Sequence, residues 1–157
     1  MSKKDIRAIK IIAQNRKARH NFFITDHLEA GIILMGSELK SIRQGKANIE
    51  EAYATEQNGE LYLLNAFISE YAAAKHFSHE PKRPRKLLLK KREVHKLMGA
   101  IKRQGITLVP LSFYFNEQGR VKVDLGLALG KKQHDKREHD KERDWGLQKA
   151  RIMRARG

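Results

Sequence analysis

The sequence has no cysteine, only three prolines, and far fewer acidic than basic residues. Without cysteine, neither a disulfide framework nor a thiolate zinc site is possible. No apolar run is long enough to cross a membrane, no lipidation motif is present, and the start lacks the charged and apolar segments of a signal peptide. We therefore expect a cytoplasmic protein that does not bind membranes. We also expect a monomer.

Basic residues dominate what is present. The chain has 33 Lys and Arg against 18 Asp and Glu, which gives a formal net charge of +15. This exceeds the modest net charge that solubility alone requires. An acidic partner is therefore predicted, and nucleic acid is favoured over an anionic membrane surface because no apolar or lipidated anchor accompanies the charge.

The length and apolar content predict a single folded domain with extensions. A chain of 157 residues that is 40% apolar can bury one core. We expect a basic N-terminal arm and first strand in 1–20, a β-barrel that binds RNA in 21–130, and a basic C-terminal tail in 131–157. Residues 131–144 contain no apolar side chain. Ordering them would cost roughly 1 to 2 kcal/mol per residue in backbone entropy without compensation, so the tail is predicted to be disordered when free.

The first half of the predicted domain contains short strands and one short helix. The helix is expected at 38–44, because Ser37 can cap it and Gly45 can end it. The dipeptide Asn58-Gly59 favours a tight hairpin turn, since both residues tolerate a positive φ angle. The expected segments are a strand at 21–24, a turn or short helix at 26–31, a strand at 32–35, and a hairpin of strands at 51–55 and 61–69.

The second half contains the longest helix and two long strands. Apolar residues recur at helical spacing until Gly105, which predicts a helix that begins at Lys86. Strands are predicted at 106–115 and 120–129, the second with strict alternation of apolar and polar residues. Pro110 would remove a ladder hydrogen bond, so the first of these strands must lie at an edge or carry a bulge.

This succession of elements predicts a mainly β protein with helices. Five or six short strands with one long helix between them favour a small closed β-barrel of the oligonucleotide-binding type. A β-sandwich or another mixed layout stays possible on this pattern alone. A partly open barrel would also tolerate the proline within a strand.

The acidic residues are too scattered to predict an enzyme. A two-metal nuclease needs several carboxylates that converge on one point, whereas Asp124 has Lys122 as its neighbour on the same strand face. His76 and His79 have a spacing that suits a metal, but no third ligand is nearby, so solvated loop histidines are the better interpretation. No catalytic residue, metal site or cofactor is predicted, and a nuclease is kept as an alternative.

Residues suited to phosphate contacts gather in two places near the N-terminus. Within 15–20, two guanidinium groups, an ammonium, an amide and an imidazole lie in six residues, which is enough for phosphate contacts and some base-edge hydrogen bonds. Polar residues of the helix at 38–44 would project beside this arm. A solvated arm and an ion pair within the helix are the respective alternatives. The predicted RNA-binding residues are Asn15, Arg16, Lys17, Arg19, His20, Glu38, Lys40 and Arg43.

Two further basic segments lie toward the C-terminus. Residues 82–103 hold ten basic residues and one acid, and the helical part of this segment fits a solvated face as well as a binding face. In 131–144, opposite charges recur at helical spacing, which favours a helix that forms on contact with a partner. The apolar residues that follow stand among basic ones and could dock while the cations meet phosphates. A membrane-surface helix is the weaker alternative, because no sustained apolar face is present.

Five motifs, in order along the chain, resemble the bacterial tmRNA-binding protein family, also called SsrA-binding protein or small protein B. The motifs cover nearly the whole chain and read NRKARH at 15–20, EAGI at 29–32 running into GSELKSIR at 36–43, RKLLL at 85–89, GKKQHDKR at 130–137 and KARIM at 149–153. Two departures are mild. Leu39 stands where the family more usually has a β-branched residue, and Asn21 stands where an acid is common.

The resemblance implies an oligonucleotide-binding-type barrel that holds the elbow of the tRNA-like domain of tmRNA, without enzymatic activity. It implies that the protein delivers tmRNA to stalled ribosomes and that its tail probes the empty mRNA channel near the decoding centre, against small-subunit rRNA. A ribosomal structural protein is the second alternative, beside the nuclease. The tail residues expected to contact the ribosome are Lys131, Lys132, His134, Asp135, Lys136, Arg137, Trp145, Lys149, Arg151, Ile152 and Met153.

Overall fold

The structure is a computed structural model that describes residues 10–74 and 78–130. These two ranges contain nine strands, three α-helices and one short 3₁₀ turn. In chain order the elements are β1 (Lys10–Gln14), α1 (Arg16–Asn21), β2 (Phe22–Ile32), α2 (Gly36–Arg43), β3 (Ala47–Asn48), β4 (Tyr53–Gln57), β5 (Glu60–Leu64), β6 (Phe67–Ile68), the 3₁₀ turn (Ala72–Ala74), β7 (Arg85–Leu88), α3 (Lys91–Gln104), β8 (Thr107–Phe115) and β9 (Val121–Gly130).

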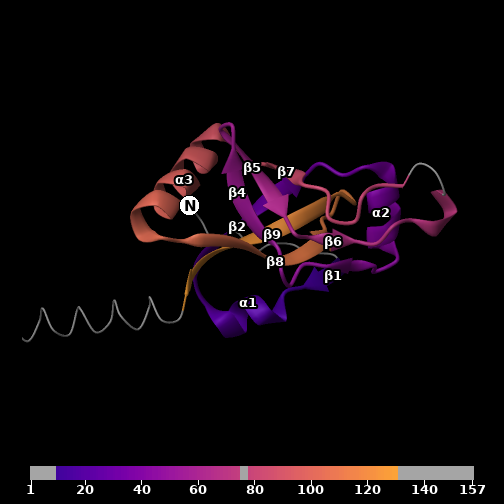
Figure 1. Ribbon diagram of the computed structural model, residues 1–157, viewed down its shortest axis with the longest axis horizontal. Coiled ribbons are helices and arrows are strands. Elements are labelled where there is room, and N and C mark those ends of the chain that lie inside the picture. The colour runs from indigo at the N-terminus through magenta and orange to yellow at the C-terminus, as the bar shows by residue number, and fades with distance from the viewer. Residues whose placement is uncertain (1–9, 75–77, 131–157) are drawn as a thin grey trace, which may run out of the picture.

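Six of the strands form a closed ring. The strand order in the large sheet is β1-β8-β4-β5-β7-β2-β9, and because β8 also pairs with β9, the sheet closes on itself. All these pairings are antiparallel. β1 adds to β8 outside the ring, and β3 and β6 form a separate two-stranded ribbon. The predicted small closed β-barrel is confirmed (Figure 1).

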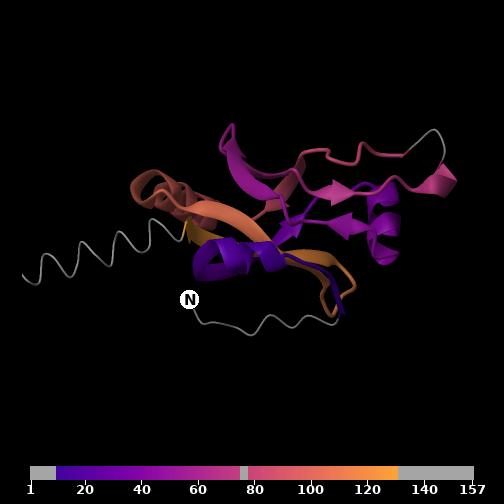
Figure 2. The ribbon, with the colours of Figure 1, turned by 60° about the horizontal axis from the view of Figure 1, so that its bottom comes forward.

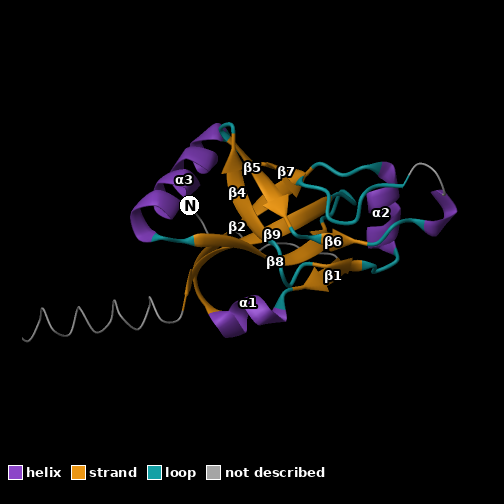
Figure 3. Ribbon diagram, viewed as in Figure 1, coloured by secondary structure: helices purple, strands orange, loops and turns teal. Residues whose placement is uncertain are grey.

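The core fills the inside of the ring, and helices cover its periphery. Leu61 and Leu63 of β5 and Val123 and Leu125 of β9 are buried at alternate positions of their strands, as expected where one face of a strand points inward. Burial of each such side chain contributes roughly 1.5 to 3 kcal/mol. In Figure 3, α3 and α2 lie at opposite ends of the barrel and α1 lies beside its strands.

Strand β8 is covered on both faces, and a bulge makes this possible. Leu108 and Phe113 belong to the main core, whereas Leu111 packs on the other side of the strand with Ala18 of α1. Leu108 and Phe113 are five positions apart, so they can share a face only if the strand carries an extra residue between them. The pairing of β8 with β9 shifts register just after Pro110, where this extra residue lies. The predicted bulge near Pro110 is therefore confirmed, and it creates the outer apolar surface on which α1 rests.

Several local predictions are confirmed. Strands β4 and β5 pair on either side of Asn58-Gly59, whose φ angles of 54° and 81° suit a two-residue hairpin turn. The alternating strand at 120–129 is β9. The helix expected at 38–44 is α2, which begins two residues earlier at Gly36 and is followed by Gly45 with a positive φ angle.

The prediction for residues 26–31 as a turn or short helix is wrong. They belong to β2, which runs without interruption through Phe22–Ile32 and pairs with β9 over most of its length. The register shift between Ile24 and Asp26 interrupts the alternation of apolar and polar residues along β2. Several polar residues in a row are exposed after it, so the sequence lacks the pattern of a strand. The strand expected at 32–35 is absent, because β2 ends at its first residue.

One predicted helix start and one predicted helix cap are also wrong. Residues 85–88 form β7, which pairs with both β5 and β2, so the long helix α3 begins at Lys91 rather than Lys86. Leu87 satisfies the helical spacing but is buried in the barrel as a strand residue. Ser37 does not cap α2; instead the Glu38 carboxylate accepts a hydrogen bond of 2.8 Å from the N–H of Met35, one residue before the helix.

Candidate nucleic-acid interface

Residues 15–20, expected as part of a basic arm, fold into the helix α1 and the residue that precedes it. Ala18 is the apolar residue of α1, and it is buried against Val109 and Leu111 of β8 and Ala128 of β9. Figure 2 shows α1 lying across the outside of the barrel. The side chains of Arg16, Lys17, Arg19 and His20 are exposed. The barrel thus holds four basic side chains in a fixed place on its surface.

Asn15 anchors α1 and is not part of the exposed surface. Its Nδ2 donates to the carbonyl of Ile49 at 3.1 Å and to that of Pro110 at 2.9 Å, and its Oδ1 accepts from the N–H of Ala18 at 3.0 Å. The side chain is buried. Its amide, which was expected to bind base edges, instead forms its hydrogen bonds within the protein. Asn15 caps the helix and ties it to a loop and to β8.

Lys17 is partly neutralised by two neighbouring glutamates. Its Nζ lies 3.0 Å from Oε1 of Glu51 and 3.9 Å from Oε2 of Glu50. The hydrogen bond to Glu51, followed by the attraction of both carboxylates, raises the pKa of Lys17. The pair is exposed, so an approaching phosphate competes with the glutamates for the ammonium group.

A pocket of about 310 Å³ opens beside Arg16 and Arg19. Tyr114 and Asp124 also line it. The buried Tyr114 hydroxyl donates to Glu29, and burial together with that carboxylate raises the pKa of Tyr114, which keeps the phenol protonated. The pocket therefore places guanidinium donors next to a carboxylate acceptor, a combination that suits a phosphate beside a base edge.

The two lining residues Tyr114 and Asp124, and Glu29, which accepts the hydrogen bond of Tyr114, were not predicted as binding residues from the sequence. Tyr114 lies in β8, Asp124 in β9 and Glu29 in β2, and only strand pairing brings them together. Asp124 also lies 2.9 Å from Nδ1 of His27. The sequence held a signal for Glu29, which lies inside a motif on which the family resemblance rests. Asp124 was considered only as a nuclease carboxylate, and no local pattern marked Tyr114.

The second predicted group, on α2, divides into one buried and two exposed residues. Glu38 is fully buried, and its carboxylate accepts hydrogen bonds from Arg85 and from Arg83, the latter at 2.5 Å. Burial alone would raise the pKa of Glu38, but the hydrogen bonds from Arg83, the Met35 N–H and Arg85 outweigh it and lower the pKa. The expectation that Glu38 projects beside residues 15–20 is wrong, because it supports α2 from within.

Lys40 and Arg43 are exposed on α2. The ammonium of Lys40 lies 5.3 Å from the ring centre of Tyr71, a cation–π distance. Figures 1 and 2 place α1 along the barrel and α2 at its end. The structure therefore does not merge the two predicted groups into one patch, and the cations of α2 form a separate, smaller one.

His79 is not a solvated loop histidine. It is buried, with Nδ1 2.9 Å from the hydroxyl of Ser37 and Nε2 2.8 Å from the carbonyl oxygen of Ile68. It thereby joins the loop at 78–84 to α2. His76 and the whole predicted ribosome-contacting set from Lys131 to Met153 lie outside the described residues.

A family model described as SmpB protein matches residues 12–155. The chain belongs to the SmpB family. SsrA-binding proteins of Rhodopseudomonas palustris (strain BisB18), Nitrobacter hamburgensis and Bradyrhizobium diazoefficiens are 61%, 58% and 57% identical to it, each over the full length of both chains.

SmpB membership also agrees with the fold. A chain in a solved structure described as "tmRNA-SmpB: a journey to the center of the bacterial ribosome" is 48% identical, with a TM-score of 0.64 over 75% of this chain and 82% of that chain. The SmpB match extends through residue 155, so it includes the tail as well as the barrel. Within the described residues, no helix is long and apolar enough to span a membrane.

Proposed function

We propose that this chain is a non-enzymatic RNA-binding protein of trans-translation, which binds the tRNA-like domain of tmRNA and delivers it to stalled ribosomes in the cytoplasm. The observation that carries the proposal is α1, where exposed cations stand on a helix fixed by the buried Asn15. A preorganised cationic surface binds phosphates with little ordering of its own side chains. The family membership supplies the identity of the RNA.

Within this function the predicted residues have two roles. Arg16, Lys17, Arg19 and His20 contact the RNA backbone, and the pocket beside Arg16 and Arg19 receives a base or sugar edge. Lys40 and Arg43 extend the contact at the end of the barrel. Asn15 and Glu38 act by positioning α1 and α2, since both are buried.

The tail supplies the second contact in this proposal. Residues 131–157 enter the empty mRNA channel of the small subunit near the decoding centre and there bind rRNA. Because a channel filled by mRNA excludes them, the protein selects ribosomes that have run out of message. The composition of 131–144 supports this, since a segment without apolar residues has no apolar surface to bury and offers many charges to a partner.

The test uses tRNA-like RNA and the full-length chain. Arg16→Gln with Arg19→Gln should weaken binding by on the order of 10-fold or more and lower the slope of log affinity against log salt by about 2. The control, Lys46→Gln with Arg120→Gln, removes the same charge from exposed sites away from α1. Equal losses in both variants would mean that binding depends on bulk charge and not on α1.

A chain ended at Gly130 separates the two contacts. It should bind the tRNA-like RNA nearly as the full chain does, while tagging of stalled translation products is lost. Loss of both activities together would contradict the division between barrel and tail. Unchanged tagging would mean that the tail is not the second contact. Tagging that does not depend on this chain at all would favour a ribosomal structural protein, and cleavage of the RNA with Mg²⁺ that Asp124→Asn removes would favour a nuclease.

A further inference from the structure

The outer face of α3 is composed of basic residues. At about 100° per residue, six of its seven exposed side chains fall within an arc of roughly 140° of the helix, and the seventh, Gln104, lies outside this arc. None of the exposed side chains on this arc is acidic or apolar. They are Lys91, Arg92, His95, Lys96, Lys102 and Arg103.

The opposite face fixes α3 to the barrel. Val94 and Leu97 are buried in the core. At the start of the helix the Glu93 carboxylate accepts the N–H of Lys90 at 3.2 Å, and at its end Gly105 has a φ angle of 63° and donates to the carbonyl of Ile101. The acid of this helix is thus engaged at its first turn, and no carboxylate among the described residues forms an ion pair with the basic arc.

A glycine lies in the middle of the basic arc. Gly99 has no side chain, and Arg103 folds back across it, with its Nε donating to the Gly99 carbonyl at 3.3 Å. A Cβ at position 99 would come within 2.6 Å of Nη2 of Arg103. An interior glycine disfavours a helix, but here the missing side chain leaves the room in which Arg103 lies, so a guanidinium group occupies the centre of the arc.

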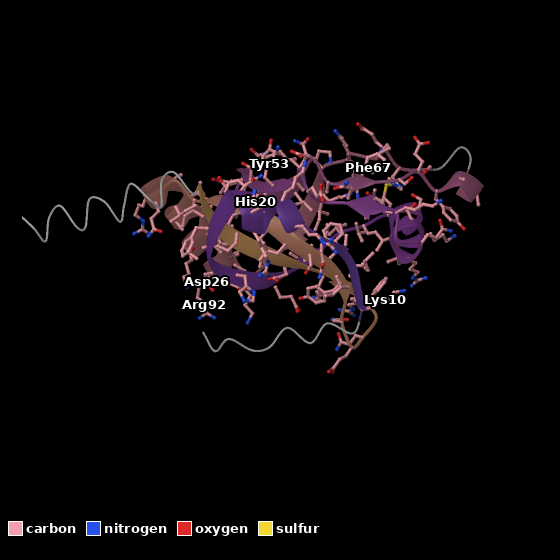
Figure 4. All side chains as sticks on the ribbon, turned by 90° about the horizontal axis from the view of Figure 1, so that it is seen from below. Lys10, His20, Asp26, Tyr53, Phe67 and Arg92 are labelled. Carbon is pink, nitrogen blue, oxygen red and sulfur yellow. The ribbon has the colours of Figure 1, made fainter. Side chains whose placement is uncertain are left out.

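Carboxylates separate this arc from the cations of α1. Asp26 and His27 of β2 line the small cavity between that strand and α3, together with Lys96. His27 forms a hydrogen bond with a second carboxylate, that of Asp124. Figure 4 shows Asp26 between His20 of α1 and Arg92 of α3. An RNA strand that ran from one basic surface to the other would have to cross these acids.

We propose that the exposed face of α3 is a second RNA-binding surface, which holds the phosphate backbone of an RNA segment other than the one bound at α1. Phosphodiester is favoured over an acidic protein because the arc offers no exposed apolar or aromatic anchor of the kind on which protein interfaces depend. Lysine-rich contacts of this kind fix the position of a backbone and read no sequence. The inference goes beyond the proposed function and does not require tmRNA to be the first ligand.

The test measures binding of a labelled mixed-sequence RNA duplex to the full chain already saturated with unlabelled tRNA-like RNA. Arg92→Gln with Lys96→Gln should weaken duplex binding by on the order of 10-fold and reduce its salt slope by about 2. Binding of the tRNA-like RNA itself should change less than about twofold, since α1 is intact. Arg120→Gln with Lys46→Gln is the matched control, again one Arg and one Lys, and should leave both steps nearly unchanged.

Gly99→Leu tests the contact without any change of charge. It favours the helix, so the fold is kept, and its side chain should displace Arg103 from the centre of the arc. Duplex binding should then weaken while the tRNA-like RNA still binds. Duplex affinity equal to that of the control pair would overturn the proposal. So would a parallel loss of both RNAs, which would make α3 part of the first site. If the tRNA-like RNA fails to bind any variant while the α3 effect on the duplex persists, the proposed function fails and this inference stands.

Discussion

Helices α1 and α2 are both short and both expose cations, and each is anchored near its start by a buried polar residue, Asn15 or Glu38, yet these two residues differ in charge. Asn15 is a neutral amide that satisfies its hydrogen-bonding groups with backbone partners. Glu38 is a carboxylate that needs two guanidinium groups around it. The comparison separates residues that can meet RNA from residues that hold them in place, and it predicts that damage to the two helices will differ in size and in kind.

The largest effect is expected at α2. Glu38→Gln leaves Arg83 and Arg85 without a carboxylate in a buried site, and breaking such a pair costs about 3 to 5 kcal/mol. Urea denaturation of the variant should show the loss directly. Glu60→Gln is the control, because the Lys86 pair that it breaks is partly exposed, and it should cost far less. Similar costs for the two variants would mean that the buried cluster is no more important than a surface pair.

Acid should reveal the same cluster in the unchanged protein. The folded state lowers the pKa of Glu38 below its ordinary value of 4.5. The carboxylate therefore contributes its full stability above pH 4.5, and the contribution is lost as pH falls through the lower folded-state pKa. The free energy of unfolding should drop more steeply in this acidic range for the natural chain than for Glu38→Gln. Parallel pH profiles would contradict this assignment.

The next effect is expected at α1. Asn15→Ala removes the helix cap and the donors to two carbonyls, which should cost about 1 to 3 kcal/mol. Hydrogen exchange should speed up at the amides of α1 and not at those of α2. The affinity for the tRNA-like RNA should fall as well, although Asn15 itself is buried. If α1 frays and the RNA still binds with unchanged affinity, α1 is not the interface.

These two anchors also show what the sequence could and could not predict. The Asn58-Gly59 turn and the alternation in β9 depend on neighbouring residues, and both were predicted. The partners of Asn15 lie 34 and 95 residues away, and Arg85 lies 47 residues from Glu38. No local pattern carries such contacts, so both anchors were taken for exposed binding residues. Their positions at helix starts were the available signal, since asparagine caps helices and an early glutamate closes a capping box.

The exposure of the cations of α1 was predicted correctly, because a charged side chain without a buried partner of opposite charge stays in contact with water. Their arrangement was not, since the arm became a helix only through the apolar patch that the bulge in β8 exposes beneath Ala18. The prediction for β2 was also wrong because of a bulge. The register shift in β2 interrupts its alternation in the sequence, although pairing with β9 makes the strand continuous. Bulges change the period of a strand, and their position depends on the partner strand.

The smallest effect is expected at the exposed pair beside α1. Glu51→Gln should release Lys17 for a phosphate and strengthen binding of the tRNA-like RNA by about two- to fivefold, the scale of an exposed ion pair. Stability should barely change, which distinguishes this site from both anchors. The same substitution in a Lys17→Gln background should have a smaller effect on affinity, because the ammonium that Glu51 restrains is gone. An equal gain in the two backgrounds would show that Glu51 repels the RNA by itself, and Lys17 would then leave the set of proposed contacts.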